Sequence, residues 1–261
     1  MDLVEKKNEN SDRHPWEIAR FKILLKLFTK HTNINSNDRF TVIDIGCGDT
    51  YFAEEFLNVF SNCEYIAVDT AFSDELIMQY NKTFKEKNRN IILHKSYSDI
   101  DNQLKARCDY IFLFDVIEHI EDEVEFLKGL YNNGLLNINA QCFITVPAYE
   151  SLFSSHDTFL KHFRRYNKSL LVKNIENAGL LNVSQGFFFF SLLFPRILNV
   201  IKEKIIPPKI TQGIGQWKSK GVIDKLIANI LVFDFVIASK LKIIGISLPG
   251  LSNFIICKKS V

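Results

Sequence analysis

FTVIDIGCGDT, residues 40–50, reads as a buried strand that ends in an acidic residue and a turn with two glycines. Its apolar residues run without clear alternation, which is typical of a strand that is covered on both faces in a parallel sheet. Gly46 and Gly48 let the backbone come close to a ligand. Because ligands bind beyond the carboxyl ends of the strands in open α/β sheets, we predict that Asp44, Gly46, Cys47 and Gly48 contact a cofactor.

The spacing of this turn separates two classes of cofactor. A dinucleotide site requires G-x-G-x-x-G, and here Tyr51 occupies the position of the third glycine. A pyrophosphate site is therefore poorly supported, and with it a nicotinamide-dependent oxidoreductase. An acidic strand end beside the glycines instead suits a ligand that carries a positive charge.

The turn resembles the first motif, D/E-x-G-x-G-x-G, of the class I S-adenosylmethionine-dependent methyltransferases. Asp44, Gly46 and Gly48 match that motif, and Thr50 stands where the family has its last glycine. The resemblance implies a Rossmann-like α/β fold, a three-layer sandwich around a seven-stranded, mostly parallel sheet with an antiparallel last strand. It also implies S-adenosyl-L-methionine as the cofactor.

Further cofactor contacts are predicted up- and downstream of this turn. Residues 64–69, EYIAVD, form a second apolar strand, and its terminal Asp69 has the role of binding the ribose hydroxyls in the resemblance. Ser96 follows a third strand, at the place where the family holds the adenine amine. Residues 14–35 contain a broad apolar helical stripe. Trp16 and Arg20 there resemble the W-x-x-x-R of relatives in which this helix closes over the cofactor, although a helix that merely docks on the core is an alternative.

A fourth strand, residues 109–114, runs into DVIEHI, which resembles the D-V-L-E-H-I of the same family. We expect a helix directly after the strand, which would place Asp115, Glu118 and His119 on one face toward the cofactor crevice. In one interpretation, His119 or Asp115 assists removal of a proton from the substrate hydroxyl. In another, the three hold Mg²⁺ or Mn²⁺, as the E-x-x-E-H element does in ubiquinone-biosynthesis O-methyltransferases and small-RNA 3′-end methyltransferases. The RNA enzymes add a further histidine after the fifth strand, where this chain offers His156 and His162. In a third, they only shape the floor of the pocket.

The segment after a fifth strand, residues 141–146, is where such folds usually bind the acceptor. Its V-P-A, H-D, H-x-R-R-Y and A-G elements resemble a bacterial subgroup of the family. His156 and His162 join His119 as candidates for handling the proton. Arg164, Arg165 and Tyr166 are predicted either to clamp a carboxylate or phosphate of the substrate or to anchor the start of a helix.

Charge is unevenly distributed along the chain. Residues 196–261 hold 11 Lys and Arg against 3 Asp and Glu, whereas residues 1–195 hold 21 against 27. We predict that residues 187–250 form a helical cap inserted before a final strand at residues 251–261. Peripheral attachment of this basic, apolar region to an anionic membrane is the alternative. Pro195, Arg196 and Asp234 argue against a transmembrane helix.

Composition supports a single domain over residues 1–261 with its core at residues 40–186, since 47% of the residues are hydrophobic. The 5 cysteines are odd in number and lack C-x-x-C spacing, which favours reduced thiols in the core. The first residues lack the apolar stretch of a signal peptide, so we expect a cytoplasmic protein. Nothing in the composition decides the oligomeric state.

These features predict a methyltransferase that transfers a methyl group in line from S-adenosylmethionine to an oxygen of a small molecule, a saccharide or a lipid-linked acceptor. One alternative is a metal-dependent RNA 3′-end methyltransferase, although no continuous basic and aromatic groove for nucleic acid is evident. Another is a non-catalytic partner protein that binds S-adenosylmethionine.

Overall fold

A seven-stranded sheet runs through the computed structural model, which describes residues 13–135, 140–206 and 221–260. The strand order is β3-β2-β1-β4-β5-β7-β6, and β7 is antiparallel to both of its neighbours. The strands are β1 (Thr41–Ile45), β2 (Glu64–Val68), β3 (Ile91–His94), β4 (Tyr110–Phe114), β5 (Gln141–Pro147), β6 (Leu180–Phe188) and β7 (Ser252–Lys259). The predicted Rossmann-like sheet with an antiparallel last strand is confirmed. The expectation of a cytoplasmic protein was based on the first residues of the chain. Residues 1–12 lie outside the described ranges.

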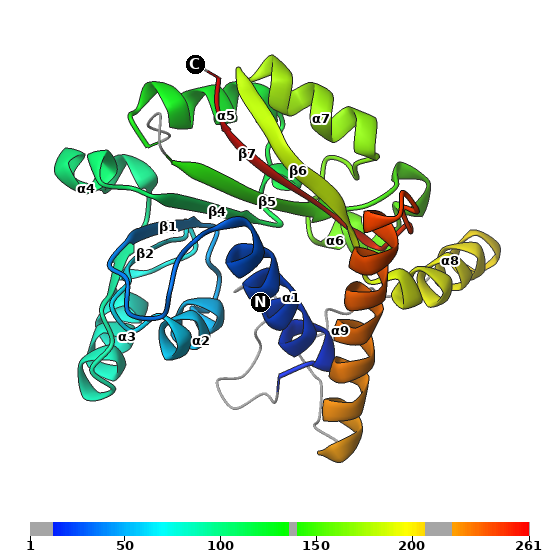
Figure 1. Cartoon of the computed structure of the whole chain (residues 1–261), viewed down its shortest axis with the longest axis horizontal. Helices are drawn as coiled ribbons and strands as arrows, with labels where there is room; N and C mark the ends of the chain where they lie inside the picture. Colours follow the sequence, from blue (N-terminus) through cyan, green and yellow to red (C-terminus); the bar gives the residue numbers. More distant parts are fainter. Residues whose placement is uncertain (1–12, 136–139, 207–220, 261) are drawn as a thin grey trace.

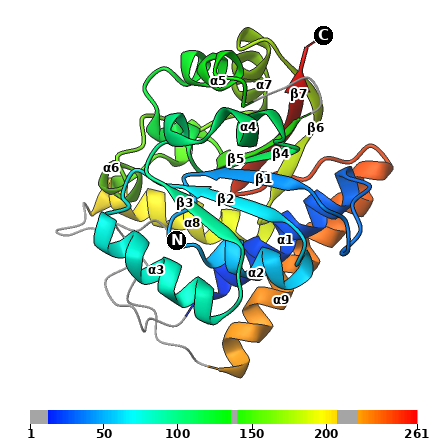
Figure 2. The same cartoon turned by 90° about the vertical axis from the view of Figure 1, so that its left-hand side faces the viewer.

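Helices cover both faces of this sheet and make three layers (Figures 1 and 2). On one face lie α1 (Pro15–His31), α2 (Tyr51–Val59), α3 (Asp74–Glu86) and α9 (Val222–Ile243). On the other lie α4 (Asn102–Ala106), α5 (Glu123–Asn132) and α7 (Lys168–Asn177). Successive strand residues point to opposite layers, so that Val42 packs with the first set and Ile43 with the second.

An aromatic cluster orients α1 across the sheet. The ring of Phe28 lies 5.2–5.8 Å, between centroids, from the rings of Phe40, Phe56, Phe60 and Phe112. Because Phe40 immediately precedes β1, the carboxyl-terminal half of α1 lies near the beginning of that strand. The amino-terminal half of α1 therefore reaches the carboxyl ends of the strands, where ligands bind in such folds.

The predicted helical insertion consists of α8 (Phe190–Ile205) and α9, which lie between β6 and β7. It begins slightly later than expected, because β6 continues through Phe188. Figure 1 shows α9 beside α1 and α8 projecting from the edge of the molecule. Among the helices in the described ranges, none has the length and apolar character needed to cross a membrane.

The helix expected directly after β4 is absent. Asp115 has a left-handed φ of 59°, and the chain then makes one short 3-10 turn, Ile117–His119, before α5 begins at Glu123. Asp115, Glu118 and His119 therefore do not share a helical face, and that prediction was wrong. The sharp turn places Val116 over the glycine turn, where a Cβ on Gly46 would lie 2.6 Å from Val116 Cγ2. The chain after β4 therefore packs tightly against the turn after β1 and does not continue as a regular helix.

Candidate active site

A cavity of about 740 Å³ lies at the carboxyl ends of the central strands, within the size range of roughly 300–1,000 Å³ that is usual for ligand sites. All the predicted cofactor and proton-handling residues line it: Trp16, Arg20, Asp44, Gly46, Cys47, Gly48, Asp69, Ser96, Asp115, His119, His156 and His162. Glu118 and Arg165 also line the cavity, whereas Arg164 and Tyr166 do not. The cavity wall therefore gathers residues from α1, the strand ends and the inserted helices.

The glycine turn connects the ends of β1 and β2. Gly46 and Gly48 have φ values of 77° and 62°, a conformation that glycine adopts without strain. The backbone N–H of Gly48 donates to Asp69 Oδ2 at 2.8 Å, and the N–H of Ala71 donates to Asp69 Oδ1 at 2.9 Å. These bonds hold the Asp69 carboxylate at the cavity. Thr50 also has a positive φ, 63°, which explains why related turns have glycine at this position.

Asp44 is the most strongly buried carboxyl group of this turn. Burial raises the pKa of Asp44 to about 7, and the nearby charge of Asp69 acts in the same direction, although a hydrogen bond from Tyr65 opposes the shift. The Tyr65 hydroxyl donates to Asp44 Oδ2 at 2.7 Å. Asp44 therefore changes its protonation near neutral pH, and a cationic ligand group beside it would favour the carboxylate.

An ion pair links α1 to the ends of β4 and β5. Arg20 Nη2 lies 2.8 Å from Asp115 Oδ2 and donates to Thr145 Oγ1 at 3.1 Å. The Thr145 hydroxyl donates in turn to Asp115 Oδ1 at 3.0 Å. The guanidinium of Arg20 also lies 5.3 Å from the centre of the Trp16 ring. Asp115 is thus engaged by α1 and β5.

Three potential ligand atoms converge on the floor of the cavity. They belong to Glu118, His119 and His162, and all lie within 4.8 Å of one another. Of the predicted metal ligands, this set contains Glu118 and His119 but not Asp115, and His162 is one of the two further histidines that the resemblance suggested. Glu118 is fully buried, and its carboxyl oxygens make no hydrogen bond to any described residue. Burial, assisted by the charge of Asp115, raises the pKa of Glu118 well above its ordinary value.

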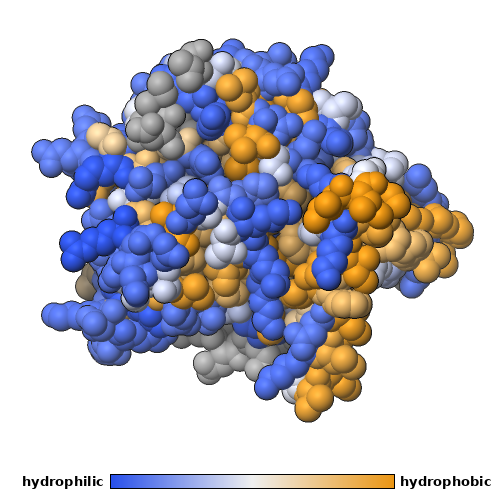
Figure 3. Space-filling view, in the orientation of Figure 1, coloured by the Kyte–Doolittle hydropathy of each residue, from blue (hydrophilic) through white to orange (hydrophobic). Residues whose placement is uncertain are grey.

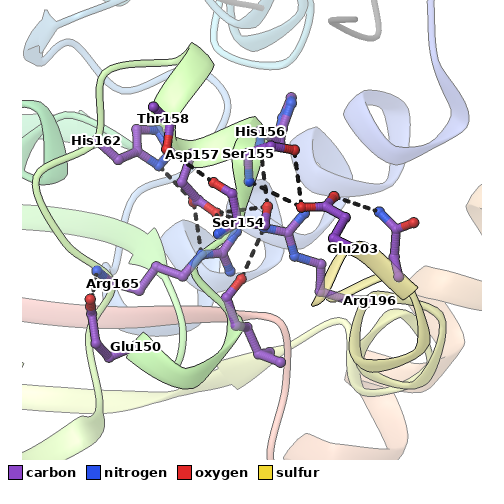
Figure 4. Close-up of polar contacts among 12 residues, drawn as sticks. Glu150, Ser154, Ser155, His156, Asp157, Thr158, His162, Arg165, Arg196 and Glu203 are labelled. Atoms are coloured by element: carbon purple, nitrogen blue, oxygen red, sulfur yellow. Dashed lines mark hydrogen bonds and ion pairs between the residues drawn. The ribbon is translucent and has the colours of Figure 1, made fainter. Parts of the chain in front are cut away.

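Asp157, on α6 (Ser155–Phe159), is the centre of a buried polar network (Figure 4). Its Oδ1 lies 2.9 Å from His162 Nδ1 and accepts from Arg165 Nε at 2.8 Å, while its Oδ2 accepts from Arg196 Nη2 at 2.6 Å. Although burial opposes it, the hydrogen bond from His162 and the charges of Arg165 and Arg196 lower the pKa of Asp157 below its ordinary value. Asp157 therefore stays ionised at neutral pH.

An ionised carboxylate can only accept hydrogen bonds. The proton in the bond between His162 and Asp157 must therefore reside on His162 Nδ1, and whenever the imidazole carries only this proton its Nε2 is an acceptor. His156 lies near the same network, where burial and the charge of Arg196 lower the pKa of His156. A proton-accepting imidazole thus lies at the wall of the cavity.

Arg196 is a site residue that sequence reasoning missed. It projects from α8 into the network. About two helical turns further along α8, Glu203 accepts from the backbone N–H and the hydroxyl of Ser155 at 3.1 and 3.0 Å. The inserted helix is therefore fastened to the segment after β5. A single charged residue within the apolar stretch of residues 187–201 was the signal that could have indicated a buried ionic role.

Arg164 and Tyr166 hold the surrounding loops together. Tyr166 is buried and donates to the carbonyl oxygen of Ile117 at 3.2 Å. Arg164 forms an ion pair with Glu123 and donates to the carbonyl oxygen of Glu121 at 2.6 Å. These contacts join the segment before α7 to residues 117–123, at and before the start of α5. Arg165 alone of the three faces the cavity.

Comparison with known proteins assigns this arrangement to a family. A model of a methyltransferase domain matches residues 14–191, more than half of the chain. The chain belongs to this methyltransferase family. The predicted membership of the class I S-adenosylmethionine-dependent methyltransferases is confirmed at the level of family and fold. None of the curated proteins matches the sequence.

Solved structures show the same fold at low sequence identity. A candidate sarcosine dimethylglycine methyltransferase from Galdieria sulphuraria is 12% identical, with a TM-score of 0.53 and coverage of 92% of this methyltransferase and 84% of that chain. Phosphoethanolamine N-methyltransferase 2 of Haemonchus contortus, in complex with S-adenosylhomocysteine, is 17% identical with a TM-score of 0.54. The alignment covers 92% of this methyltransferase but only 52% of the Haemonchus contortus protein.

A third structure shows how little the fold alone says about the reaction. The [4+2]-cyclase SpnF is 13% identical, with a TM-score of 0.57 and coverage of 97% of this methyltransferase and 85% of the cyclase. The family match, together with the chemistry of the cavity, must therefore carry the functional argument. The residues around the glycine turn fit the donor of the family, since Gly46 and Gly48 line the cavity beside two carboxyl groups, Asp44 and Asp69.

Proposed function

We propose that this methyltransferase transfers the methyl group of S-adenosylmethionine to an oxygen atom of a small molecule, a saccharide or a lipid-linked acceptor. The observation that carries the proposal is the hydrogen bond between His162 and the ionised Asp157 at the cavity wall. It orients an imidazole whose free Nε2 can accept a proton. A hydroxyl acceptor has to lose its proton during transfer, so such a base is useful for it.

The donor would lie across the strand ends. Asp44 would accept from the ammonium group of its amino-acid portion, the backbone from Gly46 through Gly48 would lie against it, and Asp69 would bind the ribose hydroxyls. Ser96 would lie near the adenine. Trp16 and Arg20 of α1 would cover the donor from the opposite side.

When bound, the sulfonium donor supplies an already activated methyl group. The protein then has to hold the acceptor oxygen in line with the methyl carbon and sulfur, and such alignment can supply several kcal/mol of the reduction in barrier, on the order of 7–11 in the best cases. His162 Nε2 would take the acceptor proton, and Asp157 would stabilise the resulting imidazolium. His119 and His156 are the competing bases.

Charge at the acceptor end favours substrates with an anionic group. Arg165 and Arg196 both line the cavity, and both contact the single carboxylate of Asp157. A carboxylate or phosphate on the acceptor could accept from the remaining N–H groups of either guanidinium. Arg165 is the residue of the predicted arginine clamp that has access to the cavity.

The test of the proposal begins with the donor. Calorimetric titration of the purified protein with S-adenosylhomocysteine should show binding that Asp69→Ala weakens strongly, while NAD should not bind. Hydroxyl and amine acceptors would then be screened with labelled S-adenosylmethionine. Absence of S-adenosylhomocysteine binding would overturn the assignment of the cavity, and turnover on amines alone would overturn the choice of oxygen.

A second use of the same residues is a divalent metal site formed by Glu118, His119 and His162. One carboxylate and two imidazoles can coordinate a divalent transition-metal cation such as Mn²⁺, and a histidine ligand whose other nitrogen bonds a carboxylate is common in metal sites. Such an ion would polarise the acceptor oxygen. Since His162 has only Nε2 free, it would serve either as a ligand or as a base.

Titration with Mn²⁺ separates these two uses. Binding that Glu118→Gln abolishes, together with activity that a chelator removes, would support the metal. An RNA 3′ end is the acceptor in the metal-dependent alternative, and RNA binding that falls steeply with salt would support that alternative.

A further inference from the structure

The inserted helix α9 has two apolar faces. One face is buried, with Ala228, Leu231 and Phe235 packed in the core cluster that includes α1. The other consists of exposed side chains at helical spacings of three and four: Ile223, Leu226, Ile230, Phe233 and Ile237. Since an α-helix rises 1.5 Å per residue, this stripe is about 20 Å long. Folding of the chain leaves it without a partner among the described residues.

Helix α8 carries a similar stripe. Leu193 and Val200 are buried on one side of it, and the exposed apolar residues on the other side are Phe194, Ile197, Leu198, Ile201 and Ile205. Figure 3 shows hydrophobic side chains gathered over α8 and α9 on one side of the molecule. We refer to the ten exposed apolar residues of the two stripes as the α8–α9 face. It is far larger than the isolated exposed residues that surfaces normally carry.

The charges around this face have one sign. The acidic residues of the two helices point inward: Glu203 accepts from Ser155, Asp234 accepts from the backbone N–H and hydroxyl of Ser191 at 2.7 Å, and Asp224 is buried. Four lysines, in contrast, are exposed: Lys202, Lys204, Lys225 and Lys240. Lys242 instead donates to the carbonyl oxygen of Gln185 and lies over the ring of Phe254, so it is held at the sheet. An apolar face flanked by exposed lysines, with its carboxylates withdrawn, is complementary to an anionic surface.

We propose that the α8–α9 face docks on the surface of an anionic phospholipid bilayer. Apolar side chains would enter the boundary between headgroups and acyl chains, and the flanking lysines would lie at the lipid phosphates. A second copy of the chain fits less well, because a two-fold interface brings the same patch from both copies together. Lysine would then face lysine with no exposed carboxylate of α8 or α9 to pair it.

The docked helices also form part of the cavity wall. Leu192 and Arg196 of α8 and Ile227 and Leu231 of α9 line the cavity. Docking would thus bring that wall next to the membrane, where a lipid-linked acceptor resides. This last step rests on the proposed function, whereas docking itself does not.

Flotation of the full-length protein with vesicles tests docking directly. We expect it to float with vesicles of phosphatidylcholine and phosphatidylglycerol, to float weakly with phosphatidylcholine alone, and to be released by salt. Leu226→Ser with Phe233→Ser should weaken binding about tenfold or more, since each removes apolar burial. Lys225→Gln with Lys240→Gln should weaken it about fivefold for each lysine.

Matched controls lie on α3, which belongs to another part of the surface. Met78→Ser removes an exposed apolar side chain, and Lys82→Gln with Lys85→Gln removes two exposed lysines. These variants should bind vesicles like the wild type. All variants should retain binding of S-adenosylhomocysteine, which reports that they are folded and separates failure of docking from failure of the proposed function.

Three results would overturn docking. The first is no flotation of the wild type with anionic vesicles. The second is an equal loss in the α3 controls. The third is a dimer, detected by light scattering, that Phe233→Ser dissociates, because the face would then be covered by a second copy.

Discussion

The protonation of Asp44 should couple donor binding to pH. Burial raises the pKa of Asp44 to about 7, and in the proposed function the ammonium of the donor would pair with the carboxylate. Affinity for S-adenosylhomocysteine should therefore fall as pH drops below about 7, by up to about tenfold per pH unit for one linked proton. Calorimetry in buffers of different ionisation enthalpy would detect the proton released on binding.

Asp44→Asn is the control for this coupling. The variant should bind more weakly above pH 7 but with a flat pH profile. Without donor, Asp44→Asn should also be more stable than the wild type at high pH. A raised folded-state pKa means that the unfolded chain loses its proton first, so wild-type stability decreases between about pH 4 and 7. An equally steep binding profile in Asp44→Asn would contradict the assignment.

His162 should matter for turnover more than for binding. His162→Gln keeps a side chain that can donate to Asp157 but removes the basic nitrogen, so kcat should fall by about 10²–10⁴-fold with the affinity for S-adenosylhomocysteine unchanged. The pH profile of kcat should lose the limb that reports protonation of the general base. His156→Gln is the matched control, and an equal loss in that variant would mean that His162 is not the base.

At the scale of elements, Asp157 should stabilise the junction between α6 and α8. Asp157→Asn leaves Arg165 and Arg196 without their shared carboxylate, and loss of one partner from a buried ion pair destabilises by about 3–5 kcal/mol. Urea unfolding measures this difference. Loss of less than about 1 kcal/mol would show that the network does not hold α8.

The same network should make the protein sensitive to acid. Because the pKa of Asp157 is lowered in the fold, its contribution to stability is present above the unfolded value of 3.8 and is lost as pH falls below it. Melting temperatures measured down to low pH should decrease steeply in the wild type. Asp157→Asn should flatten that decrease.

The contact between the β1 and β4 turns should not tolerate a side chain at Gly46. Its φ of 77° strains any other residue, and a new Cβ would lie 2.6 Å from Val116 Cγ2. Gly46→Ala should cost about 1–3 kcal/mol from the backbone alone and weaken binding of S-adenosylhomocysteine. Adding Val116→Ala should restore part of the stability, and strict additivity in this cycle would argue against the contact.

At the scale of the whole molecule, the two faces of α9 should respond differently to truncation. Phe235→Ala empties a buried position and should destabilise the protein by about 3–5 kcal/mol, whereas Phe233→Ala at 64% exposure should change stability by less than about 0.5 kcal/mol. Denaturant unfolding of both variants checks this. Equal effects would mean that α9 does not dock on α1 as described.

Much of the donor side of the site was predictable from local sequence. Asp44, the glycines and Asp69 belong to strand ends and turns whose residue pattern is local, and parallel strands bring their carboxyl ends together without further information. The conformation of the segment after β4 was not predictable, because its helical spacing of acidic and basic residues gave no sign of the left-handed turn at Asp115. The contact with Gly46 across the sheet favours that turn.

The sequence by itself therefore indicated the parallel strands and the turn residues at their carboxyl ends, since periodicity and turn chemistry act over short distances. The family and the antiparallel last strand followed from the resemblance of its motifs. Only the tertiary structure decided that His162 replaces Asp115 beside Glu118, that Arg196 reaches Asp157, and that α8 and α9 expose their second apolar faces. Those arrangements depend on how helices dock. Residues that are far apart in the chain meet there, and no local pattern encodes their distance.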